Sequence, residues 1–150
     1  MAVDKKQQYI SERRVARKLA LIAIYQWQMT GNTYQEIYAG LQEDKDLSKD
    51  ISKADMAFFQ NLTKCAMDNT SEIDAELKPF LDREAEHLDQ IERAMLRLAT
   101  CELMNHPEVP YKVIVNESVN LTKKFGADQA HKFVNGVLDK LGAKIRAEEN

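Results

Sequence analysis

Apolar residues recur at intervals of three and four along most of this chain, which is the spacing of one face of an α-helix. In the first such segment, residues 11–29, these positions are Val15, Leu19, Ile22 and Ala23. Gly31 follows, where glycine commonly ends a helix. The same periodicity covers residues 33–41, 53–69, 71–78, 89–105, 110–125 and 128–145. No convincing β-alternation appears, so the pattern predicts an all-α protein of six or seven helices.

Residues that start or stop helices divide these segments. Ser71 and Asp74 stand three apart, as in a capping box, and Pro79 predicts the end of that helix because proline disfavours helical geometry in the residue before it. Pro110 suits the first turn of the helix predicted over residues 110–125. The charged stretch 42–50 is predicted to be a loop. A length of 150 residues predicts one domain, 1–150, built as two helical halves of about 9–80 and 81–146.

Charge divides the chain more sharply than its net value of −3 suggests. Residues 1–18 carry six bases against two acids, and residues 110–146 carry seven bases against three acids. Between them, residues 68–92 carry nine acids against two bases. One such molecule can attract a polyanion at one place and a basic protein at another. The alternative that these are only solvated helix faces stays open.

The predicted first helix gathers its bases on one side. With about 100° per residue, Arg13, Arg14, Arg17 and Lys18 fall within about 140° of one another, beside the apolar stripe. Tyr25 continues the line of Arg14 and Lys18 along the helix. Basic side chains neutralise phosphates and aromatic rings stack on unpaired bases, so this face is a candidate RNA-binding surface. A soluble surface helix would show the same pattern.

Residues 123–133 form a second candidate surface for nucleic acid. Here Lys132 and Phe133 follow two lysines, Phe125 and a glycine-containing turn, at the predicted start of the last helix. A helix N-terminus offers free N–H groups to phosphate. The alternative is that both phenylalanines are core residues that flank a turn.

Catalytic, metal-binding and membrane functions find no support in the residues. The three histidines lie in separate segments without metal-ligand spacing, and no nucleotide-binding loop, zinc-protease motif or nucleophile elbow occurs. We expect no catalytic residue, no metal and no cofactor, and thus not an enzyme. The N-terminus is polar and no apolar run reaches the length of a membrane span. The expected location is cytoplasmic, without membrane association.

Two blocks of sequence resemble the NusB family of bacterial transcription antitermination proteins. The first block is Arg-Arg-Val-Ala-Arg at 13–17 followed by Ile-Tyr-Gln-Trp-Gln at 24–28. The second runs from Val-Pro-Tyr-Lys-Val at 109–113 through Lys-Lys-Phe-Gly at 123–126 to His-Lys-Phe-Val-Asn-Gly-Val-Leu-Asp at 131–139. The resemblance spans about residues 11–141 and is weakest over 31–75.

The resemblance implies a fold, partners and site residues. Its members are all-helical, with two packed helical subdomains, and bind the boxA element of single-stranded nascent RNA together with a small-subunit ribosomal protein called NusE. That complex joins RNA polymerase and promotes antitermination, notably on ribosomal RNA operons. Carried over residue by residue, the resemblance implies RNA binding by Arg13, Arg14, Arg17, Lys132 and Phe133, with Lys18 strengthening the basic face. It places Tyr25, Glu86 and Glu92 near the NusE contact.

Two other interpretations remain open from the sequence. The chain could be a helical protein-binding scaffold without an RNA role, which would show no salt-dependent affinity for RNA. It could also be a stand-alone relative of the helical RNA-binding domain attached to some RNA cytosine methyltransferases, although these 150 residues leave no room for the catalytic domain of such an enzyme. The sequence leaves monomer and homodimer both possible.

Overall fold

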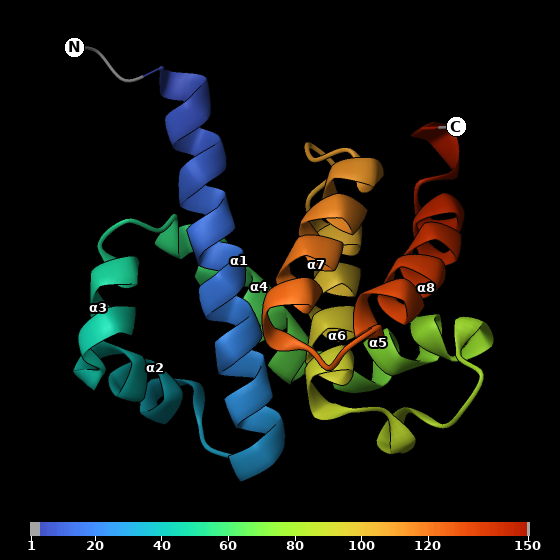
Figure 1. Ribbon diagram of the computed structural model, residues 1–150, viewed down its shortest axis with the longest axis horizontal. Helices are drawn as coiled ribbons and strands as arrows, with labels where there is room; N and C mark the ends of the chain where they lie inside the picture. The colour runs from blue at the N-terminus through green and yellow to red at the C-terminus, as the bar shows by residue number, and fades with distance from the viewer. Residues whose placement is uncertain (1–3, 150) are drawn as a thin grey trace. The chain divides into compact units, whose positions relative to one another are not determined.

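The computed structural model of the protein describes residues 4–149 and contains helices and connecting loops there, without a strand (Figure 1). The prediction of an all-α fold is confirmed, with eight α-helices in the described part rather than six or seven. The α-helices are α1 (Lys5–Thr30), α2 (Tyr34–Glu43), α3 (Lys45–Ile51), α4 (Met56–Asp68), α5 (Thr70–Leu77), α6 (Gln90–Asn105), α7 (Tyr111–Phe125) and α8 (Ala130–Ile145). Three 3-10 turns are η1 (Lys78–Phe80), η2 (Ala85–His87) and η3 (Ala147–Glu149).

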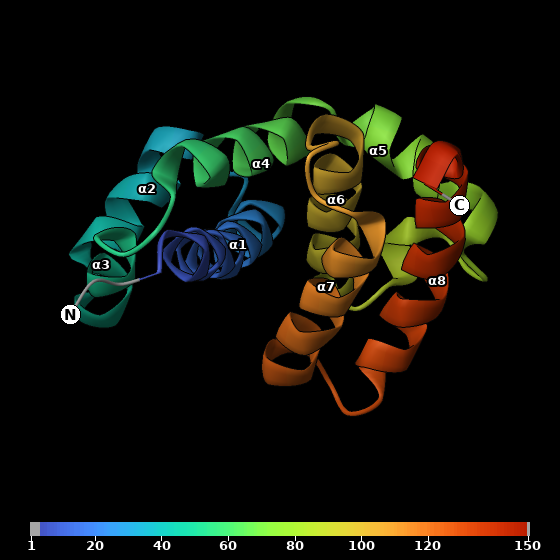
Figure 2. The same cartoon turned by 90° about the horizontal axis from the view of Figure 1, so that it is seen from above.

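The first compact unit, residues 1–67, is built around α1. Figure 2 shows α1 almost end-on, with α2, α3 and α4 arranged around it. Large side chains from α1, α2 and α4 are fully buried, among them Leu19, Leu41 and Phe59. The Asp4 carboxylate accepts the Lys6 N–H at 3.0 Å and starts α1 six residues before the predicted start. Gly31 ends it at φ 72°, a left-handed conformation that glycine adopts without steric cost.

Helix α3 is the element that the sequence prediction missed. Residues 42–50 were expected to be a charged loop, and this expectation is wrong, because residues 42–43 end α2 and residues 45–50 belong to α3. The Asp44 carboxylate accepts the N–H groups of Asp46 and Leu47 at 2.9 and 3.0 Å, which satisfies donors that the first turn leaves open. Asp44 is also the C-terminal cap residue of α2, so α2 and α3 follow each other without a loop between them.

The second compact unit, residues 68–150, consists of α5 to α8 with the three 3-10 turns. Helices α6, α7 and α8 pack on one another, and α5 packs on α6. Helix α5 belongs to this unit, because the division between the two units falls after Met67. The predicted Ser71–Asp74 capping box does not form, since α5 begins without a side-chain cap. Asp74 instead pairs with Arg97 of α6.

The α6–α7 connection is held from the C-terminal end of the chain. The buried Arg146 guanidinium donates hydrogen bonds to the backbone carbonyls of Leu103, His106 and Val109, at 2.8 to 2.9 Å. Glu149 pairs with Arg146 and accepts the Tyr111 N–H at 3.0 Å. Pro110 offers no side-chain cap to α7, so Glu149, 38 residues after Tyr111, caps that helix.

Candidate nucleic-acid and partner interfaces

The basic face of α1 is partly covered by side chains from α4. The Arg13 guanidinium lies between two rings, 4.7 Å from the Tyr9 centroid and 4.1 Å from the Phe58 centroid, and its Nε is 3.5 Å from the Asp55 carboxylate. Arg17 also stacks on Phe58, at 5.2 Å, and is only 5% exposed. These cation–aromatic contacts hold two of the predicted RNA-binding arginines in fixed positions.

The other two bases of this face differ in environment. The Lys18 ammonium is 2.8 Å from the Asp50 carboxylate at the end of α3 and is about one third exposed. Arg14 is exposed. Arg17 is buried against Phe58, so it contributes to the packing of α1 as well as to the charge of this face. The missing signal lay in Phe58, whose ring covers the guanidinium groups, and helical periodicity on α1 cannot reveal a partner from α4.

The second candidate surface lies at the start of α8. Lys132 is exposed in the first turn, and Phe133 beside it is half-buried. The Arg83 guanidinium, from the segment between η1 and η2, lies 5.0 Å from the centre of the Phe133 ring. Gln129 precedes the helix at φ 70°, and its carbonyl accepts the Lys132 N–H at 3.1 Å. Phe133 is neither a fully buried core residue nor a freely exposed aromatic ring, because the Arg83 guanidinium lies against it.

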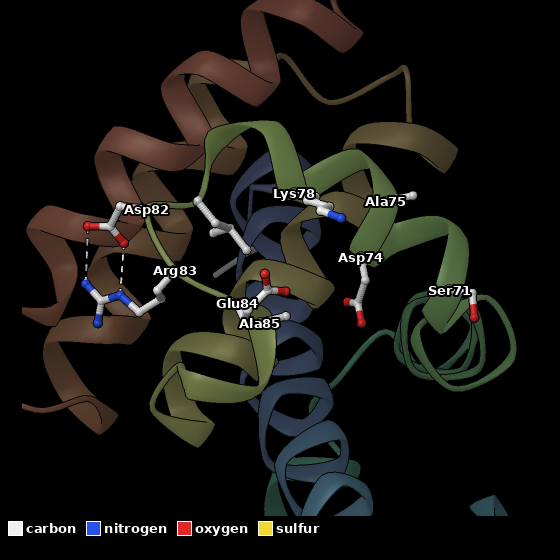
Figure 3. A pocket seen from close by; sticks show the side chains of 9 residues that line it. Ser71, Asp74, Ala75, Lys78, Asp82, Arg83, Glu84 and Ala85 are labelled. Atoms are coloured by element: carbon white, nitrogen blue, oxygen red, sulfur yellow. Dashed lines mark hydrogen bonds and ion pairs between the residues drawn. The ribbon is translucent and has the colours of Figure 1, made fainter.

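A shallow groove of about 680 Å³ opens beside Arg83, between α5 and the segment that follows η1. Figure 3 shows Asp82 and Arg83 joined at one side of it and Asp74 at another. Arg83 Nε donates to Asp82 Oδ1 at 2.9 Å, and this hydrogen bond lowers the pKa of Asp82 and raises that of Arg83. Charged groups of both signs line the groove, which is typical of a contact surface rather than an enclosed apolar ligand pocket.

Much of the acidic stretch 68–92 is already engaged. Asp74 binds Arg97 in two hydrogen bonds of 3.0 and 2.9 Å, and Glu76 lies 3.4 Å from the Lys144 ammonium. Asp82 pairs with Arg83, and Asp89 caps α6 by accepting the Ile91 and Glu92 N–H groups. The exposed acids that remain are Asp68, Glu72, Glu84 and Glu86. The negative charge that this stretch offers to a partner is therefore smaller than its nine acids against two bases suggest.

The three predicted partner-binding residues have different environments. Glu86 is exposed in η2, and Tyr25 is half-buried on α1, in the other unit. Glu92 is half-buried, and its Oε2 atom has no hydrogen-bond partner among residues 4–149. Burial raises the pKa of Glu92, and Asp89 adds to the rise. A buried carboxylate oxygen without a donor is a group that a partner's cation can satisfy.

Within residues 4–149 no group of three or more His, Cys, Asp or Glu side chains is placed to hold a metal ion. None of the helices described combines the length and the apolar character that a membrane span requires.

The fold and these surfaces define a small all-α protein with charged contact faces. Residues 14–143 match the family model described as the NusB family. The transcription antitermination protein NusB of Alteromonas mediterranea is 47% identical over 140 residues, covering 93% of this chain and 97% of its own. The chain belongs to the NusB family, as its two sequence blocks predicted.

Solved structures agree with this assignment. A T. maritima NusB structure has a TM-score of 0.72 and 26% identity, and covers 88% of this chain and 91% of its own. A complex of the antitermination factors NusB and NusE with double-stranded RNA has a TM-score of 0.69 and 26% identity, covering 87% of this chain and 96% of its own. The predicted fold class and family are both confirmed.

Proposed function

We propose that this protein is a transcription antitermination factor that binds boxA RNA together with the ribosomal protein NusE and joins the RNA polymerase antitermination complex, notably on ribosomal RNA operons. Family membership over residues 14–143 carries the proposal. The solved assembly of two antitermination factors with RNA, to which this fold is similar, supports both partners. The function requires no catalytic residue, metal or cofactor of this chain, and its place is the cytoplasm, where transcription occurs.

The proposed RNA-binding residues are Arg13, Arg14, Arg17, Lys18, Lys132 and Phe133. Among those on α1, exposed Arg14 is best placed for a phosphate contact, while Arg13 and Arg17 also serve the packing of α1 on Phe58. Arg14→Ala therefore removes charge with little effect on the fold. Lys49→Ala, on exposed α3 of the same unit, removes the same charge elsewhere and is the matched control.

The experiment measures binding of boxA-type RNA against a scrambled RNA, with and without NusE, over a range of salt concentrations. We expect preference for boxA and tighter binding with NusE. Arg14→Ala lowers the salt slope by about 0.7, the value for one phosphate contact on a single strand, whereas Lys49→Ala leaves it unchanged. Equal binding of boxA and scrambled RNA, with no gain on adding NusE, contradicts the function and leaves the protein-scaffold interpretation.

The form of the RNA is a separate arm of this experiment. Sequence reading in RNA generally needs unpaired bases, so we expect the single strand to bind more tightly than its duplex. The solved NusB–NusE complex was obtained with double-stranded RNA, which makes the duplex a necessary competitor. Equal affinity for the duplex shows that the backbone rather than the bases is recognised.

The proposed NusE-binding residues are Tyr25, Glu86 and Glu92. NusE is expected to be basic, as RNA-binding ribosomal proteins tend to be, and complementary charge raises the association rate. We expect Glu86→Lys to slow NusE association, whereas Glu72→Lys, an equally exposed change on α5, does not. Equal slowing by both variants means that only net charge matters and that η2 is not the docking site. Sedimentation of the free protein decides between monomer and homodimer.

A further inference from the structure

The second candidate surface contains one more positively charged residue, Arg83. Arg83 lies outside the resembling sequence blocks, yet its guanidinium stacks on Phe133, 5.0 Å from the ring centre. The Asp82 carboxylate holds the same guanidinium from the side, with Nε at 2.9 Å and Nη2 at 3.5 Å. These contacts therefore hold the guanidinium from two sides.

The stacked guanidinium remains accessible. The Arg83 side chain is 46% exposed, and it lines the groove beside α5 (Figure 3). Phe133 lies against the guanidinium, which has two flat faces and is left partly open to solvent. An unpaired RNA base stacks on an arginine plane as it does on an aromatic ring. The exposed Lys132 lies next to Phe133 in the chain, where it adds positive charge for the neighbouring phosphates.

We propose that Arg83 is a further RNA-contacting residue, whose guanidinium, backed by Phe133 and oriented by Asp82, is the surface on which an unpaired base stacks. The inference rests on the proposed function. Phe133 then acts as a support beneath the stacking surface, and Asp82 sets the orientation of the guanidinium while offsetting its positive charge. The site recognises a flat, unpaired base together with its backbone, and a duplex without unpaired bases does not fit it.

The simplest competing explanation is that Arg83 only anchors the segment between η1 and η2 to α8. The chain offers a matched control, because Lys144 lies 5.9 Å from the Phe80 ring centre and 3.4 Å from Glu76. Lys144→Ala removes one positive charge from an acid–cation–aromatic cluster in the same unit. Circular dichroism checks that both variants keep their helical content.

The test measures the affinity of the NusE-bound protein for boxA-type single-stranded RNA at several salt concentrations. Arg83→Ala is expected to weaken binding at least about 5-fold, the lower end of what one base stack contributes, while Lys144→Ala stays within about 2-fold. Arg83→Lys keeps the charge and recovers the salt slope but remains weaker, because an ammonium offers no plane. Asp82→Asn steepens the salt slope, since it removes the negative charge that offsets the guanidinium.

Two results overturn the inference. If Arg83→Ala matches Lys144→Ala, Arg83 is only an anchor. If Arg83→Ala binds RNA more tightly than the unmodified protein, Arg83 shields Phe133 and the ring itself takes the base. Failure of the proposed function is distinguishable from both, because then the unmodified protein already fails to prefer boxA over scrambled RNA.

Discussion

The ion pair between Asp74 and Arg97 is predicted to stabilise the second unit strongly. Arg97 is only 3% exposed and Asp74 29% exposed, and two hydrogen bonds of 3.0 and 2.9 Å join them. Asp74→Ala leaves a buried guanidinium without its carboxylate. Removing one partner of a fully buried pair costs about 3–5 kcal/mol. Water can reach the Asp74 side, so we expect a loss of about 2–3 kcal/mol in the free energy of unfolding.

The matched control is Asp82→Ala. Asp82 and Arg83 form a similar two-point pair in the same unit, but water surrounds both side chains. Exposed pairs contribute little, because solvent screens the attraction and ordering two side chains costs entropy. We therefore expect Asp82→Ala to leave the unfolding midpoint unchanged. Asp74→Asn, which keeps the shape and one acceptor, should fall between Asp74→Ala and the unmodified protein.

Urea and thermal unfolding followed by circular dichroism measure this difference. For a chain of this length, 2–3 kcal/mol corresponds to a fall of about 5–10 °C in Tm. Trp27 is the single tryptophan and lies on α1, so its fluorescence reports on the first unit separately. A midpoint for Asp74→Ala no lower than that for Asp82→Ala would refute the reasoning, because burial would then not distinguish the two pairs.

Three further predictions concern single side chains. Arg17→Ala should lower the free energy of unfolding by about 1–3 kcal/mol through lost packing on Phe58, whereas exposed Arg14→Ala should change it by less than about 0.5 kcal/mol in the same urea assay. Glu92→Gln should become increasingly stabilising as the pH rises above 4.5, because burial raises the pKa of Glu92 above that ordinary value and its ionised form opposes folding until the pH passes the raised pKa; a constant difference across pH would contradict this. Glu149→Ala should speed hydrogen exchange of the Tyr111 amide at neutral pH. The hydrogen bond from that amide lowers the pKa of Glu149, so the protection is present above its ordinary pKa and lost on acidification; unchanged exchange would show that Glu149 does not cap α7.

Local signals in the sequence predicted most of the fold. Helical periodicity located seven of the eight helices of residues 4–149, and Gly31 marked a real helix end. The exception, α3, has only seven residues and too short an apolar pattern to recognise among its charges. Asp44 was the available sign, since an aspartate before a short segment can cap it.

The candidate site was less accessible to sequence reasoning, because its key contacts join distant segments. Arg13 meets Phe58 and Asp55, and Arg83 meets Phe133 fifty residues further on. Such partners leave no periodic signal in either segment. Asp74 was read as a helix cap because its spacing from Ser71 suits one, and only the position of α6 shows that it pairs with Arg97. Charge counts therefore overstated both the basic face and the acidic stretch.

Gln129 limits how the turn before α8 can vary. Its φ of 70° is sterically unfavourable for residues with a side chain, and especially for valine, isoleucine and threonine, whose branched side chains crowd the backbone. Gln129→Gly should therefore be tolerated and should stabilise the turn, whereas Gln129→Val should disrupt the turn conformation. Libraries that aim to change RNA preference around Lys132 and Phe133 would best keep position 129 to glycine, asparagine or aspartate and place their diversity in the helix itself. Variants that break this restriction would be lost through misfolding, and their absence after selection would be mistaken for a demand of the RNA.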